Sequence, residues 1–99
     1  MSRVMFTISY GIKPEYRDQY LALIGEMKNH LTNMGRHNYS VFAAKGKQNH
    51  FTEVFITNSM EEFDSLEDHL DEKAQELIST LQGFVDNAGM KYNTIVELV

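Results

Sequence analysis

His69 is the side chain whose chemistry stands out first, because imidazole titrates near neutral pH and can act as an acid or a base. Its segment has helical periodicity, and His69 falls about 60° around the helix from Leu66, at the border of the apolar stripe. That position favours a solvated histidine, whereas a bend at Asp71 would turn the ring inward. We take His69 as the candidate catalytic residue, with an exposed surface histidine as the alternative.

Several other kinds of reactive site are excluded by residue type and spacing. The chain contains no cysteine, so disulfides, thiolate metal ligands and cysteine nucleophiles are ruled out. The four histidines have no metal-ligand spacing with one another or with carboxylates, and we therefore predict no metal site. The sequence also has no phosphate loop, nucleophile elbow or dinucleotide fingerprint.

Glu53 is a second side chain of interest, since it alternates with Phe51 and Phe55 in an apolar strand pattern. The three residues should therefore share one face of a sheet. A carboxylate on such a face costs free energy unless it is paired. We expect an ion pair with Arg3 or Lys91 across an interface, in preference to a catalytic role.

These residues are positioned by six predicted elements. Alternating apolar residues predict strands over 3–12, 38–45, 51–57 and 90–99. Steps of three and four predict a helix over 16–34, which Gly35 ends. A second helix over 59–85 begins at a capping box in which Ser59 precedes Glu62, and we allow a bend near 69–70.

The order β-α-β-β-α-β predicts an α+β, ferredoxin-like fold with a four-stranded antiparallel sheet and both helices on one face. We expect the other face to carry Met5, Phe51, Glu53 and Phe55, an apolar surface that needs a partner. Two copies stacked sheet to sheet would form a dimeric α/β barrel, so we predict a homodimer.

A ligand pocket is expected between the sheet and the helices. The same side chains at the same spacings would equally fill an ordinary core, which is the alternative interpretation. The predicted pocket walls are Phe6, Ile8, Tyr10, Tyr20, Ile24, Met27, Phe63 and Leu66.

Composition limits the possible partners. The chain of 99 residues is 42% apolar and 23% charged, as expected for one globular domain over residues 1–99. Its net charge of −5 combines +4 in residues 1–50 with −9 in residues 51–99. We interpret the acidic run at 61–76 as a solvated helix face; contact with the basic half of a second chain is the alternative. An acidic surface repels nucleic acid, and no run approaches the roughly 18 apolar residues of a membrane span.

We therefore expect a cytoplasmic protein with no nucleic-acid or membrane partner, because the N-terminus also lacks the pattern of an export signal.

The whole chain resembles the antibiotic biosynthesis monooxygenase-like proteins of the dimeric α/β-barrel superfamily. The resemblance rests on element order, length, and a run in which Glu53 lies within a strand, Ser59 caps a helix and Phe63 follows. The chain departs from the family pattern in having no tryptophan, and Leu66 stands where the family's histidine normally falls. Haem-degrading relatives carry an Asn in the first strand and an axial His, for which Thr7 and Glu76 are the nearest matches here.

The resemblance implies oxygen chemistry without metal, flavin or any other cofactor, on a small phenol or quinol that is deprotonated to an electron-rich anion. A monooxygenase-like activity is thus our first hypothesis for function. The alternative is a non-catalytic small-molecule-binding or interaction module on the same barrel, and an isomerase-like or stress-responsive member of the superfamily is a third. An empty pocket of a few hundred cubic ångström with a His or Tyr in it would favour the enzyme.

Overall fold

A computed structural model describes residues 2–35, 38–66, 68 and 70–99. The sheet is built from β1 (Val4–Gly11), β2 (Tyr39–Ala43), β3 (His50–Thr57) and β4 (Lys91–Val96). Its order is β2-β3-β1-β4, and every neighbouring pair is antiparallel. The predicted ferredoxin-like α+β fold is confirmed.

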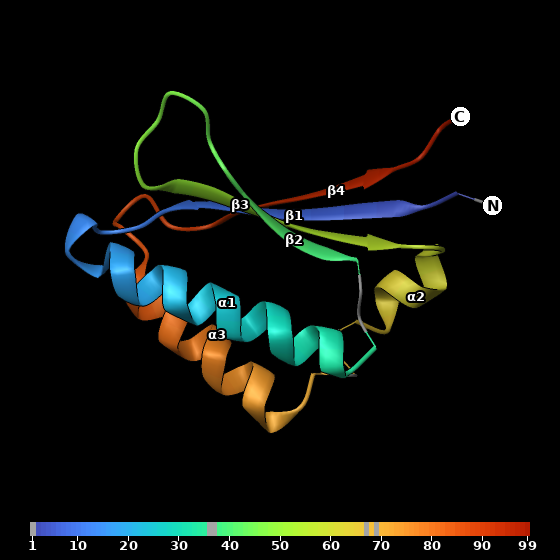
Figure 1. Ribbon diagram of the computed structural model, residues 1–99. Helices are drawn as coiled ribbons and strands as arrows, with labels where there is room; N and C mark the ends of the chain where they lie inside the picture. The colour runs from blue at the N-terminus through green and yellow to red at the C-terminus, as the bar shows by residue number, and fades with distance from the viewer. Residues whose placement is uncertain (1, 36–37, 67, 69) are drawn as a thin grey trace.

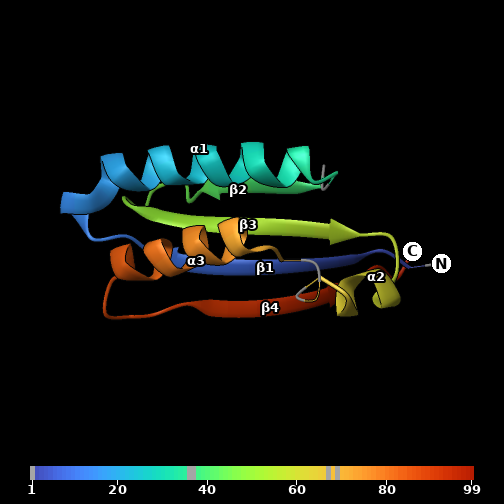
Figure 2. The ribbon, with the colours of Figure 1, turned by 90° about the horizontal axis from the view of Figure 1, so that it is seen from below.

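The helices all lie on one side of the sheet (Figure 1). They are a short 3-10 helix, η1 (Pro14–Tyr16), followed by α1 (Arg17–Asn33), α2 (Met60–Asp64) and α3 (Glu72–Phe84). Seen from the helix side, α1 and α3 run along the sheet while no long helix covers β4 (Figure 2). All six residues of β4 are exposed, which agrees with that view.

The predicted helix over 59–85 consists of two separate helices. The Ser59 side chain accepts from the backbone amide of Glu62 and begins α2. The Asp71 carboxylate accepts from the Ala74 amide at 2.9 Å and begins α3. Each cap satisfies an amide that has no partner within its own helix. Gly35 follows α1 with φ 83°, in the left-handed region where glycine is favoured, as its predicted role as a helix stop requires.

The core lies between the sheet and the two long helices. Its centre combines aromatic side chains of the sheet with the apolar stripes of α1 and α3. The buried stripe residues are Tyr20, Leu23, Met27 and Leu31 of α1 and Ala74, Leu77 and Leu81 of α3.

The register of β1 and β3 corrects the predicted composition of the open sheet face. Phe51, Glu53 and Phe55 pair with residues of β1 whose side chains turn toward the helices. Phe51 and Glu53 are only 5% and 4% exposed, so the prediction that they form a dimer interface is wrong. Of the four residues expected there, Met5 alone lies on the open face, together with the exposed Phe42 and Ile95. The homodimer itself stays a prediction.

The expected pairing of Glu53 with Arg3 or Lys91 is also wrong. Arg3 forms an ion pair with Glu97 at 2.9 Å near the chain ends. Lys91 belongs to β4 opposite Ser9, on the other face of the sheet from Glu53. The buried Glu53 carboxyl group is bonded to the uncharged Tyr39 hydroxyl instead.

No helix among the described residues is long and apolar enough to cross a membrane.

Candidate functional site

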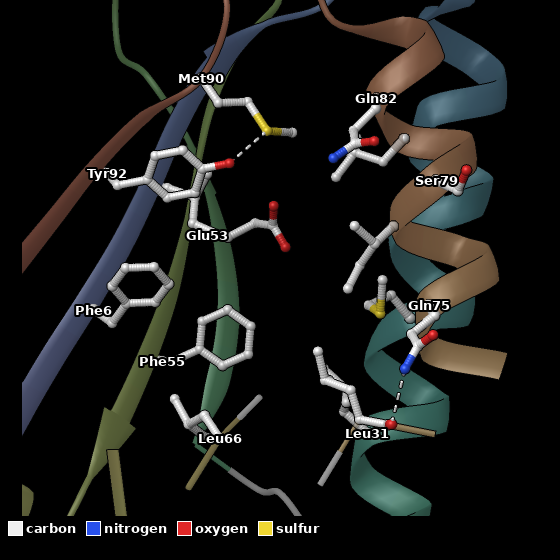
Figure 3. A pocket seen from close by; sticks show the side chains of 15 residues that line it. Phe6, Leu31, Glu53, Phe55, Leu66, Gln75, Ser79, Gln82, Met90 and Tyr92 are labelled. Atoms are coloured by element: carbon white, nitrogen blue, oxygen red, sulfur yellow. Dashed lines mark hydrogen bonds between the residues drawn. The ribbon is translucent and has the colours of Figure 1, made fainter. Parts of the chain in front are cut away.

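A cavity of about 480 Å³ lies between the sheet and α3 (Figure 3). This volume falls within the range of small-molecule sites. Strands β1, β3 and β4 form one wall, and α3 forms the opposite wall together with Met27 and Leu31 of α1. Most of the lining is apolar, including Phe6, Ile8, Met27, Leu31, Phe55, Leu66, Leu70, Ile78, Leu81 and Met90.

Glu53 is the acid that β3 directs into this apolar space, and Figure 3 shows its carboxyl group pointing into the cavity. Its Oε1 atom accepts a hydrogen bond of 2.7 Å from the Tyr39 hydroxyl. Burial raises the pKa of Glu53 above its ordinary value of 4.5, because removing a carboxylate from water disfavours the charged form. Hydrogen bonds from Tyr39 and Tyr10 act in the opposite direction without cancelling this effect.

Three buried tyrosines, Tyr10, Tyr20 and Tyr39, interact with Glu53 or with one another. The hydroxyls of Tyr10 and Tyr20 are 2.8 Å apart and form a hydrogen bond. Burial and the nearby carboxylate both raise the pKa of Tyr10, Tyr39 and Tyr20, so all three phenols remain protonated near neutral pH. They serve Glu53 as neutral hydroxyl groups rather than as bases.

Polar groups also line the wall opposite Glu53. Gln75, Ser79 and Gln82 recur at steps of four and three along α3 and therefore share one helix face. Tyr92 of β4 lines the cavity as well, and its hydroxyl donates to Met90 Sδ at 3.4 Å. A thioether is a weak acceptor, so a ligand oxygen can displace it. The cavity thus holds one proton acceptor and several donors within apolar walls.

The structure divides the predicted pocket residues into two groups. Phe6, Ile8, Met27 and Leu66 line the cavity. Tyr10 and Tyr20 belong to the buried core, and Ile24 packs against that core. Phe63 does not line the cavity and instead contacts the Phe6 ring, with centroids 5.5 Å apart.

The predicted catalytic residue, His69, lies outside the described residues. Elsewhere, His30 of α1 contacts both Asp71 carboxylate oxygens, at 2.9 and 3.0 Å, and so links α1 to the cap of α3. In the part of the chain that the structure describes, no three His, Asp or Glu side chains come together as metal ligands.

Sequence reasoning missed Glu53 and the polar face of α3 as cavity residues. A signal for the last was present, since Gln75, Ser79 and Gln82 recur at helical spacing beside the apolar stripe. Glu53 gave no such signal, because alternation shows which residues share a sheet face and not which face the helices cover.

Comparisons with known proteins identify the fold. No protein-family model matches the chain, and no curated protein matches its sequence. An antibiotic biosynthesis monooxygenase of known structure is similar over 100% of this chain and 98% of its own, with 17% identity and a TM-score of 0.71.

A structure from Caulobacter crescentus with a provisional antibiotic biosynthesis monooxygenase name is similar over 99% of this chain and 91% of its own, with 6% identity and a TM-score of 0.77. A NIPSNAP family protein from Agrobacterium tumefaciens is similar over 94% of this chain and 90% of its own, with 14% identity and a TM-score of 0.75. These matches confirm, as a likeness of fold over the full length, the resemblance seen in the sequence.

Proposed function

We propose that this protein is a cofactor-independent monooxygenase-like oxidoreductase that deprotonates a small aromatic phenol or quinol. The observation that carries the proposal is the Glu53 carboxyl group, buried in an apolar cavity of about 480 Å³ with its pKa raised. Solved structures with this fold include one named an antibiotic biosynthesis monooxygenase. Fold alone does not determine activity, so the chemistry of the cavity has to support it.

Glu53 is suited to the role of proton acceptor. A carboxylate whose pKa is raised by burial is a stronger base than one in water, and protonation removes its desolvation cost. Tyr39 holds Oε1 at 2.7 Å and orients the carboxyl group. Donors on the cavity wall, including the Tyr92 hydroxyl and the Gln82 amide, would stabilise the resulting phenolate.

The reaction balances without a metal or an added reductant. The substrate hydroxyl gives its proton to Glu53, and the ring carbon of the resulting anion transfers electrons to dioxygen as a carbon–oxygen bond forms. Glu53 returns its proton to the peroxide oxygen, and the hydroperoxide then loses water together with the hydrogen of the same ring carbon, leaving a carbonyl group on the ring. One oxygen atom enters the product, the other leaves as water, and the substrate supplies all the electrons.

Oxygen uptake with a panel of phenols and quinols tests the proposal. We expect the Glu53→Gln variant to lose at least about a hundredfold in rate, the usual scale of general base catalysis. The Glu76→Gln variant is the matched control, because the same exchange on the exposed side of α3 leaves the cavity unchanged. His69→Ala tests the catalytic residue expected from the sequence.

Unchanged uptake by Glu53→Gln would reject Glu53 as the base, and loss of uptake in His69→Ala alone would assign the role to His69. If the wild-type protein binds a quinol but consumes no oxygen, the binding module is the better description. Ligand binding is followed separately by tyrosine fluorescence, so the two results are distinguishable.

A further inference from the structure

A second cleft lies at the end of the sheet, where the β2–β3 turn meets the start of α1. This open cleft of about 740 Å³ is lined by residues of η1, α1 and the turn, and it shares no lining residue with the cavity at Glu53. Among the described residues, none that lines it is Asp or Glu, although the chain as a whole carries a net charge of −5. The local charge is therefore opposite in sign to that of the molecule.

Two contacts orient the Arg17 side chain at this cleft. Its Nη1 atom donates to Asn49 Oδ1 at 2.9 Å, and its guanidinium carbon lies 5.6 Å from the centre of the Phe51 ring. The amide acceptor and the ring face together restrict the side chain. A guanidinium group has five N–H donors, so others remain for a ligand in the fork geometry that suits oxyanions.

Asn49 provides this support from an unusual backbone conformation. Its φ of 59° lies in the left-handed region, which residues other than glycine seldom adopt. The conformation is maintained by a 2.7 Å hydrogen bond from the Ile12 amide to the Asn49 carbonyl. This bond links the residue that follows β1 to the β2–β3 turn, next to the side chain that orients Arg17.

The turn adds further donors. Lys47 lines the cleft, and no ion pair among the described residues involves Arg17 or Lys47. Gly46 and Gln48 also line it, and their backbone amides have no acceptor within the described part of the chain. Two cations with free backbone N–H groups form the kind of concavity that binds anions.

His50 is not counted among these donors. Its Nδ1 atom donates to the Gln48 carbonyl at 2.8 Å, which leaves Nε2 as the acceptor in the neutral ring. That nitrogen lies close to Gly11 and to the Asp86 carboxylate.

We propose that the cleft at Arg17 and Lys47 binds the phosphate group of a small anionic molecule. Arg17 would contact two phosphate oxygens through its fork, and Lys47 would contribute a second positive charge at close range. Near neutral pH a phosphate ester carries close to two negative charges, which matches two cations better than a single carboxylate does. The cavity at Glu53 and the function proposed for it are independent of this site.

Backbone-amide NMR titrations near neutral pH test the assignment with three probes: inorganic phosphate, phenyl phosphate and succinate. We expect saturable shifts at residues 46–49 with either phosphate. Tighter binding of phenyl phosphate would identify a phosphate ester as the source, and equal binding would identify free phosphate. Succinate, a dicarboxylate of similar charge, should bind at least several-fold more weakly.

Variants locate the site. Arg17→Gln should weaken phosphate binding about tenfold or more, and Lys47→Gln should weaken it by several-fold. Asn49→Gly keeps a residue that tolerates the left-handed backbone but removes the acceptor for Arg17, so it should also weaken binding. Lys45→Gln is the matched control: it makes the same charge change in the same turn without touching the cleft.

The proposal is overturned if no saturable shift occurs, if succinate binds as tightly as phosphate, or if Arg17→Gln and Lys45→Gln weaken binding equally. Because Arg17 is exposed, its substitution should leave the fold intact, and an unchanged amide spectrum away from the cleft verifies this.

Discussion

The hydrogen bond between Tyr39 and Glu53 can be tested by removing one oxygen atom, in the substitution Tyr39→Phe. The Tyr39 side chain is 1% exposed, and its ring packs on Phe55 with centroids 4.7 Å apart. Phenylalanine keeps that packing and removes only the 2.7 Å bond to Glu53 Oε1. The loss of stability therefore measures the hydrogen bond, because the substitution leaves no void in the core.

The loss of unfolding free energy in Tyr39→Phe depends on whether Glu53 is charged. A hydrogen bond to an ionised group contributes roughly 1.5–3 kcal/mol, and a neutral one about 1 kcal/mol. We expect Tyr39→Phe to lower the free energy of unfolding by about 2–3 kcal/mol where Glu53 is ionised. In the Glu53→Gln background, where the acceptor is a neutral amide, the same substitution should cost only about 1 kcal/mol.

The pH dependence follows from the sign of the pKa shift. The pKa of Glu53 is raised by burial, so the folded state binds this proton more tightly than the unfolded state does. The free energy of unfolding from this group therefore falls as pH rises from the ordinary value of 4.5 to the folded-state pKa. Tyr39→Phe raises that pKa further and widens the window, whereas Glu53→Gln abolishes it.

Urea unfolding followed by circular dichroism, from about pH 5 to about pH 9, measures the wild type, both single variants and the double variant. The expected result is a coupling of roughly 1–2 kcal/mol at the alkaline end that shrinks at the acid end. An equal cost of Tyr39→Phe in both backgrounds at every pH would refute the reasoning, because the hydroxyl would then not be bonded to an ionisable carboxyl group.

Three further predictions concern the scaffold. Leu81→Ala, at a position 2% exposed on the cavity-facing helix, should lower the free energy of unfolding by about 2–5 kcal/mol in urea titrations, and a loss under about 1 kcal/mol would contradict its place in the core. The Ala74 amide and then His30 hold the pKa of Asp71 below its ordinary value of 3.8, so the ionised carboxylate should stabilise the fold above pH 3.8 and lose this effect as pH falls through the folded-state pKa. Asp71→Ala should therefore lower the Tm at neutral pH and lower it much less in acid. An equal loss of Tm at neutral and at acid pH would oppose this reasoning. Ile95→Glu should convert a dimer of about twice 11.4 kDa into a monomer in light scattering, whereas a wild-type monomer would reject the stacked-sheet dimer.

The sequence predicts the elements of this fold because their signals are local. The period of two in β1, the apolar stripe of α1 and the cap at Ser59 each depend on residues within one element. Gly35 likewise marks the end of α1 through its own backbone conformation. Only the separation of α2 from α3 exceeds the bend that we expected.

The candidate site was harder to predict because the burial of Glu53 depends on which face of the sheet the helices cover. Both faces of β3 carry apolar residues, Phe51 and Phe55 on one and Val54 and Ile56 on the other, so hydropathy does not reveal which face is covered. Glu53 appears unsuited to burial until the hydroxyl of Tyr39, from the neighbouring strand, is placed beside it. That pairing follows from strand register, which the alternation of either strand alone does not determine.

The most direct test of the account is the titration of the Glu53 carboxyl carbon by NMR with labelled glutamate, its signal assigned by its loss in Glu53→Gln. The account predicts a midpoint above the ordinary value of 4.5 and a change in that signal when a quinol enters the cavity. A midpoint at or below 4.5, with a signal that no quinol alters, would contradict it.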